Sequence, residues 1–313
     1  MRDEANGRRG AAVGYGADVL GFSEKAFALL RDLIADQTGI YFPDDRRDML
    51  ADKLSDLLAR LGMTSYLDYY YLLRYDSSAA RHWSELVDRL SVPETYFWRQ
   101  PEQIVALANI VAPRHFERSP ETPLRIWSAA CCTGEEPLSI AIALAECGLL
   151  DNRPIEITAS DVSEEMLKRA RRGVYGERSF RSIPDELRQR YFEKVDGGWQ
   201  VDPSLHARIT WIRANLVAPV DVRPLAAADV IFCRNVLIYF SDPAIVRIAR
   251  VFAEELSDDG YLFLGAAESL TRLDTDFELS EVGDAFVYLK AAGLRSRHRV
   301  TAGGHACTRT EIV

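Results

Sequence analysis

The sequence predicts an α/β protein in which a helical domain precedes a parallel sheet that helices cover on both faces. Three observations support this fold class. Apolar residues keep helical spacing over residues 23–90, strand-like apolar runs alternate with amphipathic helices over 124–265, and short strands interrupt that alternation between about 174 and 214. Parallel strands joined by helices are buried on both faces, so their sequences are almost wholly apolar. The expected fold is Rossmann-like with a small inserted β-subdomain.

Composition excludes several classes of protein. The chain has 313 residues, 48% of them hydrophobic, and its net charge of −9 argues against wholesale binding of nucleic acid or of an anionic membrane. The longest apolar runs are strand-sized and no secretory signal opens the sequence, so we expect a cytoplasmic protein without membrane insertion. The five cysteines form no C-x-x-C pair and the five histidines lack metal-ligand spacing, so we expect neither disulfides nor a metal site.

The chain divides into segments of different character. Both ends are rich in small and basic residues without periodicity, which predicts disorder. The expected boundaries are a disordered N-terminus at 1–21, a helical domain at 22–90, a linker and helix at 91–123, the sheet domain at 124–291 with its insertion at about 174–214, and a disordered tail at 292–313.

The helical domain shows regular apolar spacing, as in Phe27, Leu30 and Ile34. Gly62 is expected to end its second helix and Thr64 to cap its third. From Phe22 to Leu90 the domain has nine Lys and Arg against twelve Asp and Glu, a difference of −3, so it has no overall positive charge. Arg46, Arg47 and Lys53 could still form one local positive patch.

Strands and helices then alternate in order. Ser163 is placed to cap one helix, and Gly283-Asp284 is a turn signal for the last hairpin. The expected elements are strand 124–128, helix 135–147, strand 155–160, helix 163–172, strand 229–233, helix 242–256, strand 261–265, and a hairpin of strands 277–282 and 285–290.

The segment from Leu124 to Leu138 is the most informative, because a buried strand runs into small residues and then into a helix. Small side chains allow the backbone to approach a nucleotide-like ligand, and free N–H groups at the start of the helix face it. Glu135 and Glu136 would repel a dinucleotide phosphate at this point but attract a cation. S-adenosylmethionine, which has an ammonium and a sulfonium group, is such a ligand.

Polar residues follow two later strands of the expected sheet. Asp161 comes 27 positions after Gly134, where it would either contact ribose hydroxyls or cap the next helix, and the availability of Ser163 as a cap favours the ribose role. Arg234 and Asn235 end an apolar strand abruptly. They would either point into the ligand crevice or satisfy loop carbonyls as a buried pair.

Other candidates have equally plain structural explanations. On spacing alone Thr95 and Arg99 would belong to a solvated linker, and Tyr239 would be a core residue. Asn215 and Leu216 would form either a simple turn or a loop that borders adenine. Residue patterns by themselves do not choose between these interpretations.

Four segments together resemble the bacterial chemotaxis receptor methyltransferases, the CheR family: Pro93–Arg99, Trp127–Pro137, Cys233–Phe240, and Gly260–Gly265 with Glu268. The resemblance runs in order from about Phe22 to Lys290. It implies a helical N-terminal domain, a Rossmann-like class I methyltransferase domain with an inserted β-subdomain, and methyl transfer from S-adenosylmethionine to receptor glutamates, with S-adenosylhomocysteine as product.

The resemblance also implies partners and residue roles. It implies action on the cytoplasmic helical region of chemoreceptors, with Thr95 and Arg99 near the cofactor and acceptor and Tyr239 among the reacting groups. We expect a cytoplasmic, monomeric enzyme, and our hypothesis is that Arg99 orients the acceptor carboxylate while Tyr239 donates a hydrogen bond to it. The other implied roles are cofactor contacts by Thr95, Arg99, Arg234 and Asn235, the methionyl end at Glu135 or Glu136, the ribose at Asp161, and the adenine at Asn215 and Leu216.

This chain departs from the family pattern at three places. Pro93 stands where many members have Asn, Ala130 and Cys132 replace commoner Gly and Ser, and the turn Asp196–Trp199 is short for a subdomain that grips a receptor peptide. Gly134 alone does not make a dinucleotide fingerprint, which argues against a dehydrogenase. The remaining alternative is a cofactor-binding signalling or scaffold module with little turnover.

Overall fold

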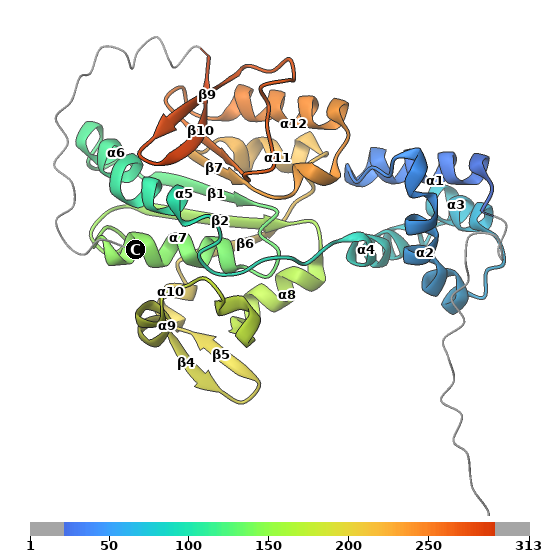
Figure 1. Ribbon diagram of the computed structural model, residues 1–313, viewed down its shortest axis with the longest axis horizontal. Helices are drawn as coiled ribbons and strands as arrows, with labels where there is room; N and C mark the ends of the chain where they lie inside the picture. The colour runs from blue at the N-terminus through green and yellow to red at the C-terminus, as the bar shows by residue number, and fades with distance from the viewer. Residues whose placement is uncertain (1–21, 292–313) are drawn as a thin grey trace, which may run out of the picture. The chain divides into compact units, whose positions relative to one another are not determined.

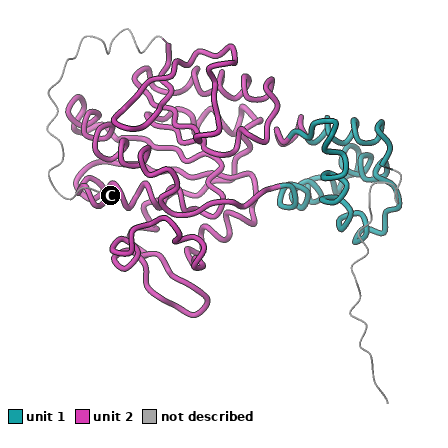
Figure 2. Tube along the Cα trace, viewed as in Figure 1, with its two compact units in different colours: residues 1–34, 41–90 teal, residues 35–40, 91–313 magenta. Residues whose placement is uncertain are grey.

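The computed structural model describes residues 22–291, which form two compact units (Figure 2). The first unit includes residues up to Ile34 and Tyr41–Leu90, and the second includes Ala35–Ile40 and everything from Ser91 onward. Ala35–Ile40 was expected in the helical domain, but it groups with the second unit, where the Gln37 carbonyl accepts a hydrogen bond from Asn215. The segments predicted to be disordered, 1–21 and 292–313, lie outside the described residues.

The first unit is helical, as predicted. Its buried side chains are mainly leucines that recur at helical spacing, such as Leu50, Leu54 and Leu58 on one face of the second helix. The elements are α1 (Glu24–Thr38, whose last turn groups with the second unit), the 3₁₀ helix η1 (Asp44–Arg46), α2 (Arg47–Leu61), α3 (Tyr66–Tyr75) and α4 (Ala79–Leu90).

The ends of two helices in this unit test local sequence signals. Gly62 ends α2 in the left-handed conformation, with φ of 65°, which confirms its predicted role. The predicted cap of α3 is wrong by one residue. Ser65 rather than Thr64 occupies the N-cap position, where its side chain accepts a hydrogen bond from the Leu67 N–H at 3.1 Å.

The second unit is built on a seven-stranded sheet in the order β6-β2-β1-β7-β8-β10-β9 (Figure 1). Neighbouring strands from β6 to β8 are parallel, and β10 is antiparallel to both of its neighbours. The chain moves outward from β1 in both directions, so the crevice of this fold lies at the carboxyl ends of β1 and β7. The strands are β1 (Leu124–Ala129), β2 (Ile155–Asp161), β6 (Ile209–Arg213), β7 (Val230–Cys233), β8 (Tyr261–Leu264), β9 (Phe277–Val282) and β10 (Ala285–Lys290).

Helices cover both faces of this sheet, as predicted, with α5, α6 and α7 on one face and α11 and α12 on the other (Figure 1). A π-helical segment separates α5 from α6, because Pro113 has no N–H with which to continue the helical ladder. The bounds are α5 (Pro101–Ala106), the π-helix η2 (Leu107–Val111), α6 (Ala112–Arg118), α7 (Glu135–Glu146), α8 (Glu164–Arg172), α11 (Pro219–Ala226) and α12 (Asp242–Glu255).

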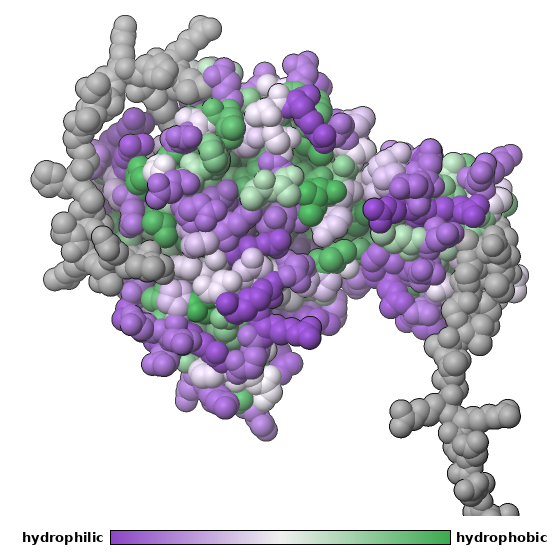
Figure 3. Space-filling model, in the orientation of Figure 1, coloured by the Kyte–Doolittle hydropathy of each residue, from purple (hydrophilic) through white to green (hydrophobic). Residues whose placement is uncertain are grey.

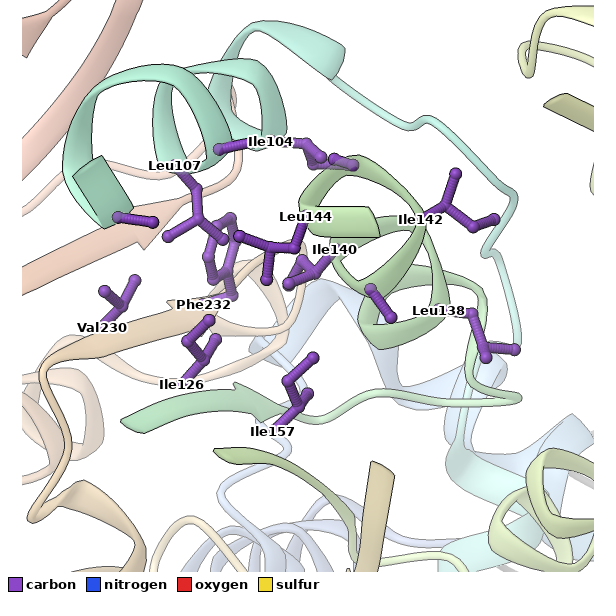
Figure 4. Packing of buried hydrophobic residues seen from close by; sticks show 14 of the residues in the cluster. Ile104, Leu107, Ile126, Leu138, Ile140, Ile142, Leu144, Ile157, Val230 and Phe232 are labelled. Atoms are coloured by element: carbon purple, nitrogen blue, oxygen red, sulfur yellow. The ribbon is translucent and has the colours of Figure 1, made fainter. Parts of the chain in front are cut away.

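Side chains of the central strands alternate between two cores. Ile126 and Phe232 belong to the core beneath α7, whereas Trp127 and Ile231 belong to the core beneath α12. Figure 4 shows Ile126 and Phe232 facing Leu144 of α7 within the first core. The fully buried Phe232 ring also stacks on Phe263, with 4.6 Å between ring centroids.

A separate three-stranded sheet, in the order β3-β5-β4, interrupts the alternation after α8. The predicted insertion of about 174–214 is too long, because β6 pairs in parallel with β2 and is an edge strand of the large sheet. The inserted elements are β3 (Val174–Tyr175), the 3₁₀ helix η3 (Glu177–Phe180), α9 (Asp185–Tyr191), β4 (Phe192–Val195), β5 (Gly198–Val201) and α10 (Pro203–His206).

The surface of the second unit is mostly polar on the face that Figure 3 shows, with hydrophobic residues scattered among charged ones. Between residues 22 and 291, no helix combines the length and apolar character needed to cross a membrane.

We expect Phe232→Ala to lower the free energy of unfolding of the second unit by about 3 to 5 kcal/mol, because it removes a fully buried ring from a packed core. Phe286→Ala, at a side chain 59% exposed, should change it by less than about 0.5 kcal/mol. Urea unfolding followed by tryptophan fluorescence measures this unit, which contains Trp98, Trp127, Trp199 and Trp211. Equal losses in the two variants would contradict the assignment of the core.

Candidate functional site

The loop after β1 adopts an unusual backbone conformation. Ala130, Cys132 and Gly134 have φ values of 56°, 51° and 96°, all in the left-handed region. A Cβ atom at Gly134 would lie 2.7 Å from the Trp211 ring, so both its φ and its neighbour favour glycine. The predicted tight loop of small residues between strand and helix is therefore present.

Two acceptors at the end of β2, a main-chain carbonyl and a side-chain carboxylate, hold this loop. The Cys131 N–H donates to the Ser160 carbonyl at 2.8 Å, and the Cys132 N–H donates to Asp161 Oδ2 at 2.9 Å. Asp161 Oδ1 accepts from the Ser163 N–H at 2.9 Å, while the Ser163 side chain caps α8 by accepting from the Met166 N–H. Ser163 is thus the cap, as predicted, and Asp161 is buried beside the loop.

Glu135, at the start of α7, is 2% exposed. Its carboxylate accepts hydrogen bonds from the Thr133 hydroxyl at 2.6 Å and from the Ser179 hydroxyl of the inserted segment at 2.9 Å. Burial raises the pKa of this carboxyl group, and the two hydroxyl groups oppose that shift. The side chain is therefore fixed in position.

Glu136 pairs with Arg234, which follows β7. Glu136 Oε1 accepts from the Ser128 hydroxyl at 2.6 Å, and its Oε2 lies 3.5 Å from Arg234 Nε. The Arg234 side chain is 1% exposed and that of Glu136 is 16% exposed. Burial raises the pKa of Glu136 and lowers that of Arg234, and the attraction between the two charges opposes each shift.

Arg234 also fixes the segment that contains Arg99. Its Nη2 donates to the Arg99 carbonyl and to Gln100 Oε1, the latter at 3.0 Å. Among the described residues, Arg234 Nη1 is buried and has no hydrogen-bond partner, and the same is true of Asn235 Oδ1. Buried polar atoms usually have a partner, so these two atoms have hydrogen-bonding capacity that a polar ligand could use.

Arg99 lies close to this pair. The pKa of Arg234 is lowered mainly by burial, and the positive charge of Arg99 lowers it further. The same charge opposes the rise that burial causes in the pKa of Glu136, although less than Arg234 does. The Arg99 Nη1 donates to the Glu94 carbonyl at 2.6 Å, and the guanidinium lies 5.5 Å from the centre of the Tyr96 ring. Arg99 is half-buried. The sequence alone assigned it to a solvated linker, and the structure instead brings it to the site.

Two further candidates, Thr95 and Tyr239, are placed by the burial of each residue and by the segment that contains it. Thr95 is half-buried in the same linker, and Tyr239 is half-buried in the 3₁₀ helix η4 (Leu237–Tyr239), shortly after Asn235. Their roles remain predictions.

Asn215 and Leu216 follow β6, beside the end of β2. The preceding residue, Ala214, donates its N–H to the Asp161 carbonyl at 3.1 Å. The Asn215 side chain donates to the Gln37 carbonyl at 2.7 Å and accepts from the Val217 N–H at 3.2 Å. Leu216 is 8% exposed. The loop is thus a tightly bonded turn next to Asp161.

Backbone strain is concentrated at this site. Among residues 22–291, five residues other than glycine have φ in the left-handed region, and all lie in the three segments just described: Trp98, Gln100, Ala130, Cys132 and Asn235. Each such residue costs free energy that the surrounding structure must offset, and such residues cluster at functional sites. This clustering makes the carboxyl ends of β1 and β7, together with the linker before α5, the candidate site.

Sequence reasoning missed several residues of this site. Ser128, Thr133 and Ser179 fix the two glutamates. Glu268 is part of the family resemblance, which gives it no role, and it accepts hydrogen bonds from the loop after β7. Ser128 offered a signal, since it is a polar residue within the apolar part of the strand that follows Arg125. Ser179 offered none, because it reaches the site from the inserted segment.

The described cysteines are free thiols. Burial raises the pKa of Cys132 to about 12 and also raises that of Cys131, so neither is activated as a nucleophile. Over residues 22–291, no group of three or more His, Cys, Asp or Glu side chains is arranged to hold a metal ion.

Comparison with protein families matches two family models to this chain. The model described as "CheR methyltransferase, SAM binding domain" matches residues 93–286, and "CheR methyltransferase, all-alpha domain" matches residues 25–91. The boundary between the two matches, at residues 91–93, coincides with the end of the first unit at Leu90.

Similar proteins support the same family. "Chemotaxis protein methyltransferase 2" of Vibrio cholerae is 33% identical over 266 residues, covering 84% of this chain and 92% of that protein. "Chemotaxis protein methyltransferase" of Escherichia coli is 33% identical over 271 residues, covering 83% and 90%. "Probable biofilm formation methyltransferase WspC" of Pseudomonas aeruginosa is 39% identical over 188 residues, covering 59% and 43%.

The raised pKa of Glu135 predicts a specific dependence of stability on pH. In the unfolded chain this carboxyl loses its proton near its ordinary pKa of 4.5, whereas the folded protein keeps it to higher pH. Between those two values the folded state binds more protons, so the contribution of Glu135 to stability falls as pH rises. We therefore expect Glu135→Gln to gain stability relative to wild type from about pH 4 upward, until pH passes the raised pKa.

Urea unfolding of wild type and variant at several pH values measures this difference, and Glu193→Gln, on β4, controls for substitution of an exposed glutamate. A difference between Glu135→Gln and wild type that does not change with pH would contradict the prediction.

Proposed function

The chain belongs to the CheR methyltransferase family, and from this premise we propose that it methylates glutamate side chains of a chemoreceptor, forming glutamate methyl esters. As a member, it is an S-adenosylmethionine-dependent methyltransferase. One observation supports the location of this activity: the buried pair of Glu136 and Arg234 meets the main chain of Arg99 where strained loops follow β1 and β7.

The residues present fit the cofactor. Buried Arg234 Nη1 and Asn235 Oδ1 have unused hydrogen-bonding capacity, as a carboxylate and an amino group would require. Glu135 and Glu136 supply negative charge for an ammonium group, and either could meet it. We assign Asp161 to the ribose, Asn215 and Leu216 to the adenine, and Thr95 and Arg99 to the reacting end. S-adenosylmethionine supplies a methyl group that its sulfonium charge makes electrophilic.

The chain's own residues would act mainly by orientation and exclusion of water. A glutamate acceptor is already ionised at neutral pH, so no strong general base is needed. Arg99 uses one Nη for the Glu94 carbonyl, which leaves other N–H groups to hold the acceptor carboxylate. Tyr239 would donate its hydroxyl hydrogen to the same carboxylate. Correct alignment of the reacting atoms can account for about 7 to 11 kcal/mol of the barrier.

The proposed partner is the helical cytoplasmic region of a chemoreceptor, since two relatives that match over most of their length are named chemotaxis protein methyltransferases. We propose that the enzyme acts in the cytoplasm as a monomer and that it does not act on nucleic acid, given the net charge of −9. The alternative is a cofactor-binding signalling or scaffold module with little turnover.

Incubation of the full chain with methyl-labelled S-adenosylmethionine and receptor-containing membranes should produce base-labile label on the receptor. Base lability is the property of a methyl ester, and excess S-adenosylhomocysteine should suppress the labelling by competing for the site. Binding of S-adenosylhomocysteine without any ester formation on the receptors tested would favour the scaffold alternative.

Arg99→Ala should lower kcat/KM for methylation by about 10²-fold and Tyr239→Phe by about tenfold, because each removes a hydrogen bond to the acceptor. Calorimetry should show that affinity for S-adenosylhomocysteine changes much less than kcat/KM. Arg118→Ala, on the exposed surface of α6, is the matched control and should behave as wild type. Unchanged methylation by the Arg99 and Tyr239 variants would show that these side chains do not orient the acceptor.

A further inference from the structure

We propose that Glu268 is a positioning residue that sets the conformation of the segment Arg234–Tyr239 and thereby aligns the side chains around the reacting groups. The inference rests on the proposed function for what those side chains do. Glu268 itself lies in the loop after β8, outside the set of residues assigned above to cofactor or acceptor. Its role follows from the hydrogen bonds of its carboxylate.

The Glu268 carboxylate accepts hydrogen bonds from four main-chain N–H groups. Oε2 accepts from Asn235 at 2.7 Å and from Gly265 at 2.6 Å. Oε1 accepts from Val236 at 2.8 Å and from Leu237 at 2.7 Å. Three consecutive N–H groups of the loop after β7 thus converge on one half-buried side chain.

These hydrogen bonds stabilise a conformation that the loop would not adopt alone. Asn235 has φ of 60°, and the amides beyond β7 have left the ladder of the sheet. A carboxylate forms stronger hydrogen bonds to N–H groups than a neutral acceptor does. Since β7 and β8 are neighbouring parallel strands, Glu268 joins the loops at their carboxyl ends.

Gly265, the residue after β8, leaves space for this contact. A Cβ atom at Gly265 would lie 2.5 Å from Asn235 Nδ2 and 2.7 Å from Glu268 Oε2. Glycine at this position therefore lets the carboxylate and the Asn235 side chain sit side by side. Arg234 precedes the bonded amides and Tyr239 follows them, so both side chains depend on the backbone that Glu268 fixes.

A purely electrostatic role is the main alternative, because Glu268 also carries a negative charge near Arg234. Substitution by aspartate separates the two explanations. Glu268→Asp keeps the charge but shortens the side chain by one methylene. If the four hydrogen bonds matter, it should lower kcat nearly as much as Glu268→Gln does. If charge alone matters, Glu268→Asp should behave as wild type.

The experiment compares Glu268→Gln and Gly265→Ala in the full chain with two matched controls. Glutamine presents N–H groups to amides that need an acceptor, and alanine at 265 pushes against the same carboxylate without removing it. Gly265→Ala also preserves the test if the glutamine variant does not fold. The controls are Glu281→Gln, which is exposed on β9, and Gly176→Ala, where an added Cβ would meet no atom within 4 Å.

Two readouts are measured well below the melting temperature of each variant. We expect kcat for receptor methylation to fall by about 10²-fold and the Kd for S-adenosylhomocysteine to rise by about tenfold in both test variants, with controls within about twofold of wild type. A lower Tm with wild-type kcat and Kd would show a structural role only and would overturn the proposal.

A double-mutant cycle with Tyr239→Phe tests whether Glu268 acts through the segment. If it does, Glu268→Gln combined with Tyr239→Phe should be little worse than the poorer single variant, whereas independent effects multiply. Multiplying losses would overturn the proposal. If wild type itself methylates no receptor, the proposed function fails, and the Kd comparison still decides the role of Glu268.

Discussion

The rest of the site depends on one kind of interaction, the hydrogen bonds that main-chain N–H groups of strained loops donate to buried or half-buried carboxylates. Asp161 holds the loop after β1 through the Cys132 N–H, and Glu268 holds the loop after β7 through three consecutive amides. Each loop contains a residue other than glycine in the left-handed region. Without these acceptors the loops would relax to commoner conformations, and the side chains that follow them would point elsewhere.

The buried pair of Glu136 and Arg234 serves the same purpose at the centre of the site. Burying two charges is costly, and their mutual attraction does not by itself guarantee a gain in stability. The pair is supported by the Ser128 hydroxyl on one side and by Gln100 on the other, so it connects β1, β7 and the linker before α5. A rigid, poorly hydrated arrangement of this kind is suited to an alkyl transfer, in which water would favour the separated charges of the reactants.

The inserted segment is part of the site and more than an attachment to it. The Tyr175 hydroxyl donates to the Thr133 carbonyl at 2.9 Å, and the Ser179 hydroxyl donates to Glu135 at the same distance. The Ser179 carbonyl in turn accepts from the Phe97 N–H in the linker that contains Arg99. The base of the insertion therefore supports both the loop after β1 and the linker, which links the geometry of the small sheet to that of the site.

The sequence by itself determined the local elements, because their signals lie within a few residues. Alternating apolar runs located the strands, the hairpin at 277–290 had its predicted bounds, and Ser163 and Gly62 ended or capped helices as expected. Only the tertiary structure decided which strands pair and which side chains meet. In the structure β6 belongs to the large sheet, where it pairs with β2, and Glu268 accepts hydrogen bonds from the amides after β7. These partners are far apart in the chain, so no local sequence pattern predicts their contact.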